Sequence, residues 1–212
     1  MPNATSTFPG TFDSLNAAYD PDIGPAVQRM QEFWGGYNGP ASLTGVNMQT
    51  FPDEFATGTI QPASGTVELA LVQFRQGHTV NTISLVTAAT AGVSLTRQWA
   101  GIASYVAGSA GVCLATSADG TSGALAADTV ITFTLTAPYV IPTSGAYYVY
   151  YCIAGSTVPT IAAGVTLSAH GRGNVAPFLY GPGDTGKTTP YAVAAAVAAP
   201  TATAVGTLLY LT

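Results

Sequence analysis

Residues 146–154 read AYYVYYCIA, and this uncharged run of aromatic and apolar side chains decides the fold class. Such a composition is typical of a β-strand, in which alternate side chains lie on opposite faces. One face carries Tyr147, Val149 and Tyr151, and the other carries Tyr148, Tyr150 and Cys152. We expect one tyrosine pair in the core, which leaves Tyr148 and Tyr150 to stack on the sugar rings of a glycan or to contact a neighbouring subunit. The alternative is that the rings form ordinary cross-strand pairs.

The strand pattern continues over the rest of the chain from residue 57. Short runs rich in Val, Ile, Thr and aromatic residues are separated by Gly, Pro and Ser clusters, which indicates strands joined by turns. The runs cover residues 66–74, 79–87, 98–106, 111–117, 129–136, 146–154 and 205–211. Residues 108–111 (GSAG) are typical of a hairpin connection, and residues 142–145 (PTSG) of a turn. No helical periodicity follows residue 56. We therefore predict an all-β fold with an antiparallel β-sandwich or jelly-roll-like body over residues 57–212.

Residues 1–56 differ from this body and are expected to form an extended N-terminal arm. They hold six acidic residues and one basic residue, a charge of −5, whereas the body holds four of each. Pro25, apolar residues at positions 23, 27, 30 and 34, and the terminating pair Gly35-Gly36 predict one short amphipathic helix. Its apolar stripe either folds back onto the body or docks into a groove of a partner. The candidate docking residues are Phe8, Phe12, Ile23, Val27, Met30, Phe33, Trp34 and Tyr37.

The scarcity of charge excludes several classes of function. Charged residues make up 7% of the chain, and five basic residues against ten acidic ones give a net charge of −5. Such a chain is unsuited to neutralising nucleic-acid phosphates or to binding an anionic membrane surface. No apolar run reaches the roughly 18 residues of a membrane-spanning helix. The first residues lack the features of a secretory signal, so we expect the chain to mature in the cytoplasm or to leave it inside an assembly. A surface with few charges is typical of a subunit that neighbours cover.

The sequence contains no recognisable catalytic or metal-binding pattern. His78 and His170 lie in Gly-flanked segments without a neighbouring nucleophile and carboxylate. Residues 181–188 (GPGDTGKT) share only their composition with a phosphate-binding loop and predict a surface turn. Asp119 and Asp184 lack the paired carboxylates of a Ca²⁺ site, which favours turn roles. We expect no enzymatic activity, no metal and no cofactor.

The two cysteines and the Ala-rich segment near the end are given structural roles. Cys113 and Cys152 are too few for a disulfide framework and predict buried free thiols. The sequence does not indicate whether these thiols lie close together. Residues 191–204 (YAVAAAVAAPTATA) predict a short helix at most, or an extended crossing loop before the last strand.

Several short motifs follow one another along residues 67–155. They are LAL at 69–71 before the Gln76-Gly77 turn, ISLVT at 83–87, WAGI at 99–102, LATSAD at 114–119, TFTL at 132–135 with Pro138-Tyr139, and PTSGAYYV at 142–149. Together they resemble the β-rich virion proteins of tailed phages of actinobacteria, described as minor tail, fibre or head-decoration proteins. The resemblance implies a non-enzymatic virion protein that binds other tail or capsid subunits. It also implies a homo-oligomer, for which a trimer is one candidate. A minor tail or fibre-type role is the first expectation. A capsid-decoration role and a host-glycan-binding module are the alternatives.

Overall fold

The computed structural model describes residues 48–50, 56–107, 109–120, 123–165, 180–201 and 205–212, where it contains fourteen strands and no helix. Most of the predicted arm, with its helix, lies outside these residues. The longer strands are β3 (Val67–Phe74), β4 (Thr79–Val86), β5 (Gly92–Ser104), β6 (Gly111–Thr116), β8 (Val130–Val140) and β9 (Gly145–Thr157). The shorter ones are β1 (Met48–Gln49), β2 (Gly58–Ile60), β7 (Gly123–Leu125), β10 (Ile161–Val165), β11 (Tyr180–Pro182), β12 (Ala196–Val197), β13 (Val205–Thr207) and β14 (Leu209–Leu211).

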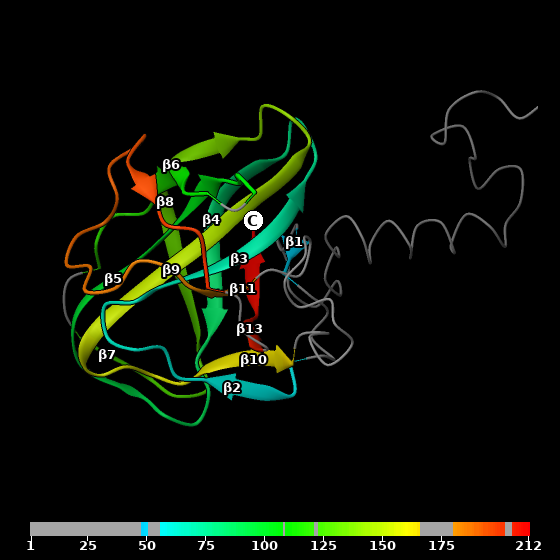
Figure 1. Cartoon of the computed structure of the whole chain (residues 1–212). Coiled ribbons are helices and arrows are strands. Elements are labelled where there is room, and N and C mark those ends of the chain that lie inside the picture. Colours follow the sequence, from blue (N-terminus) through cyan, green and yellow to red (C-terminus); the bar gives the residue numbers. More distant parts are fainter. Residues whose placement is uncertain (1–47, 51–55, 108, 121–122, 166–179, 202–204) are drawn as a thin grey trace, which may run out of the picture.

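The strands pair antiparallel throughout and build three sheets (Figure 1). The largest sheet has the order β11-β3-β9-β5-β6-β12, with β7 also paired to β5. A four-stranded sheet has the order β1-β14-β4-β8, and a three-stranded sheet has the order β13-β10-β2. The tyrosine-rich run forms β9, which lies between β3 and β5 in the middle of the largest sheet. The prediction of an all-β fold with antiparallel sheets is confirmed for the described part of the chain.

One face of the largest sheet packs against the four-stranded sheet. Val149 of β9 and Ile102 of β5 belong to the same buried cluster as Ile83 of β4, Phe133 of β8 and Leu209 of β14. Burial also alternates along β8, because Phe133 and Leu135 are buried while the threonines between and beside them are exposed. This apolar layer between two sheets is the main core.

The opposite face of the largest sheet is buried as well. Residues 183–201, which we call the strap, cross this face, and their strand β12 pairs with β6. Tyr191 and Val197 of the strap pack in one buried cluster with Leu69 of β3, Trp99 of β5 and Tyr148 of β9. The extended crossing loop expected before the last strand is therefore the form that the described residues 191–201 take. Because both faces of the largest sheet are covered, the sequence of β3 is a nearly continuous apolar run.

The connections between strands agree with the sequence at some points and differ at others. The hairpin expected around residues 108–111 joins the paired strands β5 and β6. The single strand expected over residues 205–211 is divided, because β13 pairs with β10 whereas β14 pairs with β4 in another sheet. Strand β1 and Thr50 lie within the predicted arm, yet β1 pairs with β14 and the N–H of Thr50 donates to the carbonyl of Leu209 at 3.0 Å. Residues 48–50 therefore belong to the body.

Candidate functional site

The sequence-predicted docking residues of the arm, Phe8, Phe12, Ile23, Val27, Met30, Phe33, Trp34 and Tyr37, lie outside the described residues, as does His170. Their role stays a prediction. The described candidates are the tyrosine pair of β9, the glycine-rich loop, His78, Asp119 and the two thiols.

Tyr148 and Tyr150 share one face of β9, as predicted, but neither reaches solvent. Both side chains are fully buried beneath the strap and the β5–β6 hairpin. The ring of Tyr150 meets that of Tyr191 edge to face, with centroids 5.4 Å apart, and Tyr148 meets Tyr105 in the same way at 5.3 Å. The expectation of an exposed pair that contacts a glycan or a subunit is therefore wrong for this body, because the strap occupies that face.

The glycine-rich loop fastens the strap to the sheet. The N–H of Gly183 donates to the carbonyl of Val67, and the N–H of Val67 donates to the carbonyl of Asp184, both at 2.8 Å. The Asp184 carboxylate accepts hydrogen bonds from the Tyr191 hydroxyl and from the N–H of Ala198. These bonds give the loop a structural role. Residues 181–182 belong to β11 and residues 183–188 contain a bend but no turn, so the predicted surface turn is not found there.

The two thiols are free and buried, as the sequence predicted. The Sγ of Cys113 lies 3.2 Å from the Tyr150 hydroxyl. Burial raises the pKa of Cys113, and it raises the pKa of Cys152 to about 12. Because the thiolate is the reactive form, both residues are unreactive at neutral pH. They act as small apolar residues of the strap-covered face.

His78 follows the turn between β3 and β4 and packs against Phe74, with ring centroids 5.8 Å apart. Burial lowers its pKa, so the ring is held in its neutral form at neutral pH. Among the described residues its Nε2 is buried without a hydrogen-bond partner. A triad of the serine-hydrolase type needs a carboxylate or hydroxyl that orients the ring, and no hydrogen bond to such a group is found for His78 in the described part of the chain.

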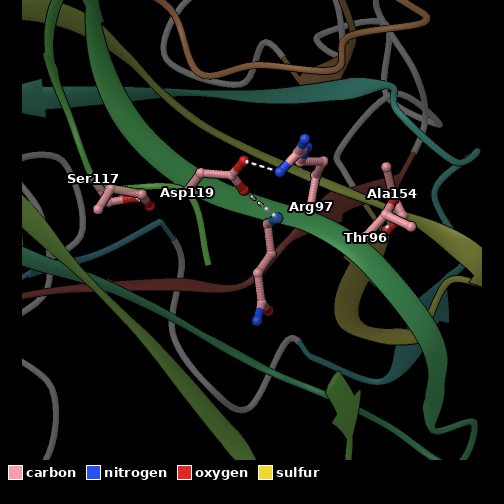
Figure 2. A network of polar contacts seen from close by, with 7 residues as sticks. Thr96, Arg97, Ser117, Asp119 and Ala154 are labelled. Carbon is pink, nitrogen blue, oxygen red and sulfur yellow. Dashed lines mark hydrogen bonds and ion pairs between the residues drawn. The ribbon is translucent and has the colours of Figure 1, made fainter. Parts of the chain in front are cut away.

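Asp119 has a structural partner. Its Oδ2 lies 3.1 Å from Nη1 of Arg97, and its Oδ1 accepts the N–H of Gln98 at 3.2 Å, as Figure 2 shows. Nearby, the Ser117 hydroxyl accepts the N–H of Ala100 at 3.0 Å. These contacts attach the segment after β6 to β5. Residues 118–120 form no turn, so Asp119 has a structural role of another kind than the predicted one: it binds the backbone and a side chain of β5.

A groove of about 290 Å³ lies beside this ion pair and opens to solvent. One wall is formed by Gln98 and residues 117–120, and the other by residues 131–134 of β8. Gln98 lines the groove, and its Oε1 is buried without a donor among the described residues. Sequence reasoning missed this groove because it arises where β6 and β8, which belong to different sheets, diverge. No local pattern records such a gap.

Glu68 is a second feature that the sequence did not reveal. It lies on β3, opposite Tyr151 of β9 and Pro182 of β11, and is 7% exposed. Burial raises the pKa of its carboxyl group to about 7. The only signal in the sequence is a single acidic residue inside an apolar run, VELALVQF, and a strand buried on both faces must then bury it.

The described residues contain no group of three or more His, Cys, Asp or Glu side chains placed to hold a metal ion. In the same residues no helix is long and apolar enough to cross a membrane. No protein-family model matches the chain, and no curated protein is significantly similar to it.

Proposed function

We propose that the chain is a non-enzymatic structural subunit of a tailed-phage particle, with a β-sandwich body and an N-terminal arm that fastens it to its neighbours. The observation that carries this proposal is that the polar side chains described above bind other parts of the same body. The Asp119 and Asp184 carboxylates, the Cys113 thiol and the Tyr150 and Tyr191 hydroxyls are each ion-paired or hydrogen-bonded within the body. The resemblance of residues 67–155 to phage virion proteins supports the assignment to a particle.

The character of the surface also supports assembly. The body has no net charge, and six valines of the described residues are more than two-fifths exposed: Val93, Val106, Val112, Val130, Val140 and Val193. Apolar side chains on a surface with few charges are tolerated where a neighbour covers them. We propose a minor tail or fibre-type component as the first candidate and a capsid-decoration protein as its rival.

Copy number separates these two roles and tests the proposal. Quantitative mass spectrometry of purified particles should find the chain in a handful of copies or a few rings if it is a tail component. Tens to hundreds of copies would instead assign it to the capsid surface. If the chain is produced during infection but is missing from purified particles, the structural role is wrong.

The role of the arm is tested by truncation. Deletion of residues 1–47 keeps β1 and its pairing with β14. We expect the truncated body to keep a β-type circular dichroism spectrum and a cooperative unfolding transition while losing incorporation into particles. Normal incorporation of the truncated body would show that the arm is not the tether.

A further inference from the structure

Strand β8 is an edge strand, and half of its backbone groups face away from its partner. The N–H of Thr87 donates to the carbonyl of Thr129 at 2.9 Å, so the backbone of residue 129 faces β4. Because successive residues of a strand direct their N–H and C=O groups to opposite sides, Val130, Thr132 and Thr134 face away from β4. On β4, the backbone N–H and C=O groups of Thr82 both bond to Thr212. The backbone of Thr82 therefore faces away from β8, which agrees with this alternation.

On that outer side, the described residues pair with β8 at one place only. An isolated bridge joins Ser117 to Leu135, and the hydroxyl of Thr136 donates to the carbonyl of Thr116 at 2.9 Å beside it. Before this bridge the two segments separate and form the groove of about 290 Å³. The backbone donors and acceptors of Val130 and Thr132 thus face a groove that no described strand fills.

The shape of the groove fits a single extended segment. Residues 117–120 form a wall opposite β8, which leaves no room for the edge of a second sheet. Ile131 and Phe133 line the groove with apolar surface. An added strand would receive main-chain hydrogen bonds from β8, as in strand addition to a sheet edge.

The charge of the groove limits what can fill it. Among the described residues that line it, only Asp119 is charged, and Asp119 is already paired with Arg97. The segment that fits is therefore uncharged and suited to a strand. Residues 1–12 (MPNATSTFPGTF) have no charged side chain, whereas residues 13–56 hold the whole net charge of −5. Between Pro2 and Pro9 this segment contains six residues with every backbone N–H present, enough to pair with residues 130–134.

We propose that the β8 edge receives residues 3–8 of a neighbouring copy as an added strand. This inference rests on the proposed structural function and names the receiving surface. The arm enters the described body at β1, and β1 and β8 are opposite edges of one sheet. The arm therefore starts on the side that faces away from its own groove, where another copy can present its β8 edge. Repeated contacts of this head-to-tail kind build rings or longer arrays.

The test is disulfide trapping between two tagged forms of the full chain. One form carries cysteine at each of residues 4–7 in turn, and the other carries Thr132→Cys. The native thiols are buried, so they contribute little background. A matched control places the second cysteine at Val193, which is 66% exposed and lies on the strap. We expect a covalent heterodimer with Thr132→Cys and its loss with Val193→Cys.

Two results would overturn the inference. If no arm position forms the heterodimer with Thr132→Cys, the edge does not receive this segment. If one doubly substituted chain cross-links only within itself, the groove binds its own arm and the neighbour is excluded. The cross-linking test uses the purified chain. Its failure would therefore not affect the proposed structural function, which is tested by incorporation into particles.

A second variant checks the role of the main chain. Because the Thr132 N–H faces away from β4, Thr132→Pro removes a donor of the groove and leaves the main-chain β4–β8 hydrogen bonds in place. The hydrogen bond between the Thr132 and Ser84 hydroxyls is lost in this variant and in the valine control alike. Thr132→Val keeps the donor and is the control. In sedimentation velocity we expect Thr132→Pro to lose the oligomer that the wild-type chain and Thr132→Val form. Equal oligomerisation of both variants would contradict strand addition, and the cysteine trap decides the matter if the proline variant does not fold.

Discussion

The substitution Glu68→Gln should remove a pH dependence that burial imposes on the stability of this fold. Glu68 is 7% exposed, and among the described residues no hydrogen bond or ion pair reaches its carboxyl group. Burial raises its pKa from 4.5 to about 7. The folded chain therefore holds this proton more tightly than the unfolded chain does.

The sign and the size of the effect follow from this difference. Between about pH 4.5 and pH 7 the folded state binds more protons, so the free energy of unfolding falls as the pH rises and levels off above pH 7. At about 1.4 kcal/mol for each pKa unit, the rise in the pKa corresponds to at most about 3 kcal/mol. Water that reaches the carboxyl group reduces this value. Glutamine resembles the neutral acid, so the variant should gain up to this amount above pH 7 and almost nothing near pH 4.5.

The assay is urea unfolding at pH 4.5, 6, 7 and 8, followed by tryptophan fluorescence. The matched control is Asp128→Asn, which removes an exposed carboxylate at a residue with a φ of 49°, a conformation that asparagine tolerates. We expect the wild-type chain and this control to lose stability together as the pH rises, while Glu68→Gln stays level. Parallel pH profiles for the wild-type chain and Glu68→Gln would show that the carboxylate has a stabilising partner, and the reasoning would fail.

Three further predictions test the packing of the strap-covered face. Gly101→Ala places a Cβ against the Tyr150 hydroxyl and the Ala115 carbonyl, and thermal unfolding should show a loss of stability of about 1–3 kcal/mol. The control is Gly145→Ala, which has open space around it and should change the stability little. Tyr191→Phe removes the hydrogen bond to the Asp184 carboxylate, which holds the strap. We expect the free energy of unfolding to fall by about 1.5–3 kcal/mol and amide exchange in residues 191–198 to become faster. Unchanged exchange there would show that this hydrogen bond does not hold the strap. Both thiols should resist a disulfide reagent in the native state and react in urea, since burial raises their pKa; rapid native reaction would contradict their burial.

The part of the fold that the sequence predicted is the part set by local pattern. Alternation divided the residues of β9 correctly between its two faces, because Val149 and Tyr151 lie in the core between the sheets and Tyr148 and Tyr150 on the opposite face.

The part that could not be predicted depends on contacts between distant segments. Whether Tyr148 and Tyr150 face solvent is decided by the strap, which begins more than thirty residues later in the chain. An alternating pattern divides a strand into two faces but does not state what covers each one. The same reason hides the groove beside β8, the division of residues 205–211 between two sheets and the burial of Glu68.

The double cover of the largest sheet changes how the composition should be interpreted. The scarcity of charge first suggested a surface hidden by partners, but much of the apolar content lies in β3 and β9, whose two faces are buried within the chain itself. Low charge alone is therefore weak evidence for assembly. The stronger evidence is local: Val130 and Val140, 54% and 56% exposed, lie at the two ends of β8, the strand whose free edge borders the groove. Exposed apolar residues and unpaired backbone on the same strand identify this edge as the place where contact with a neighbour would replace water.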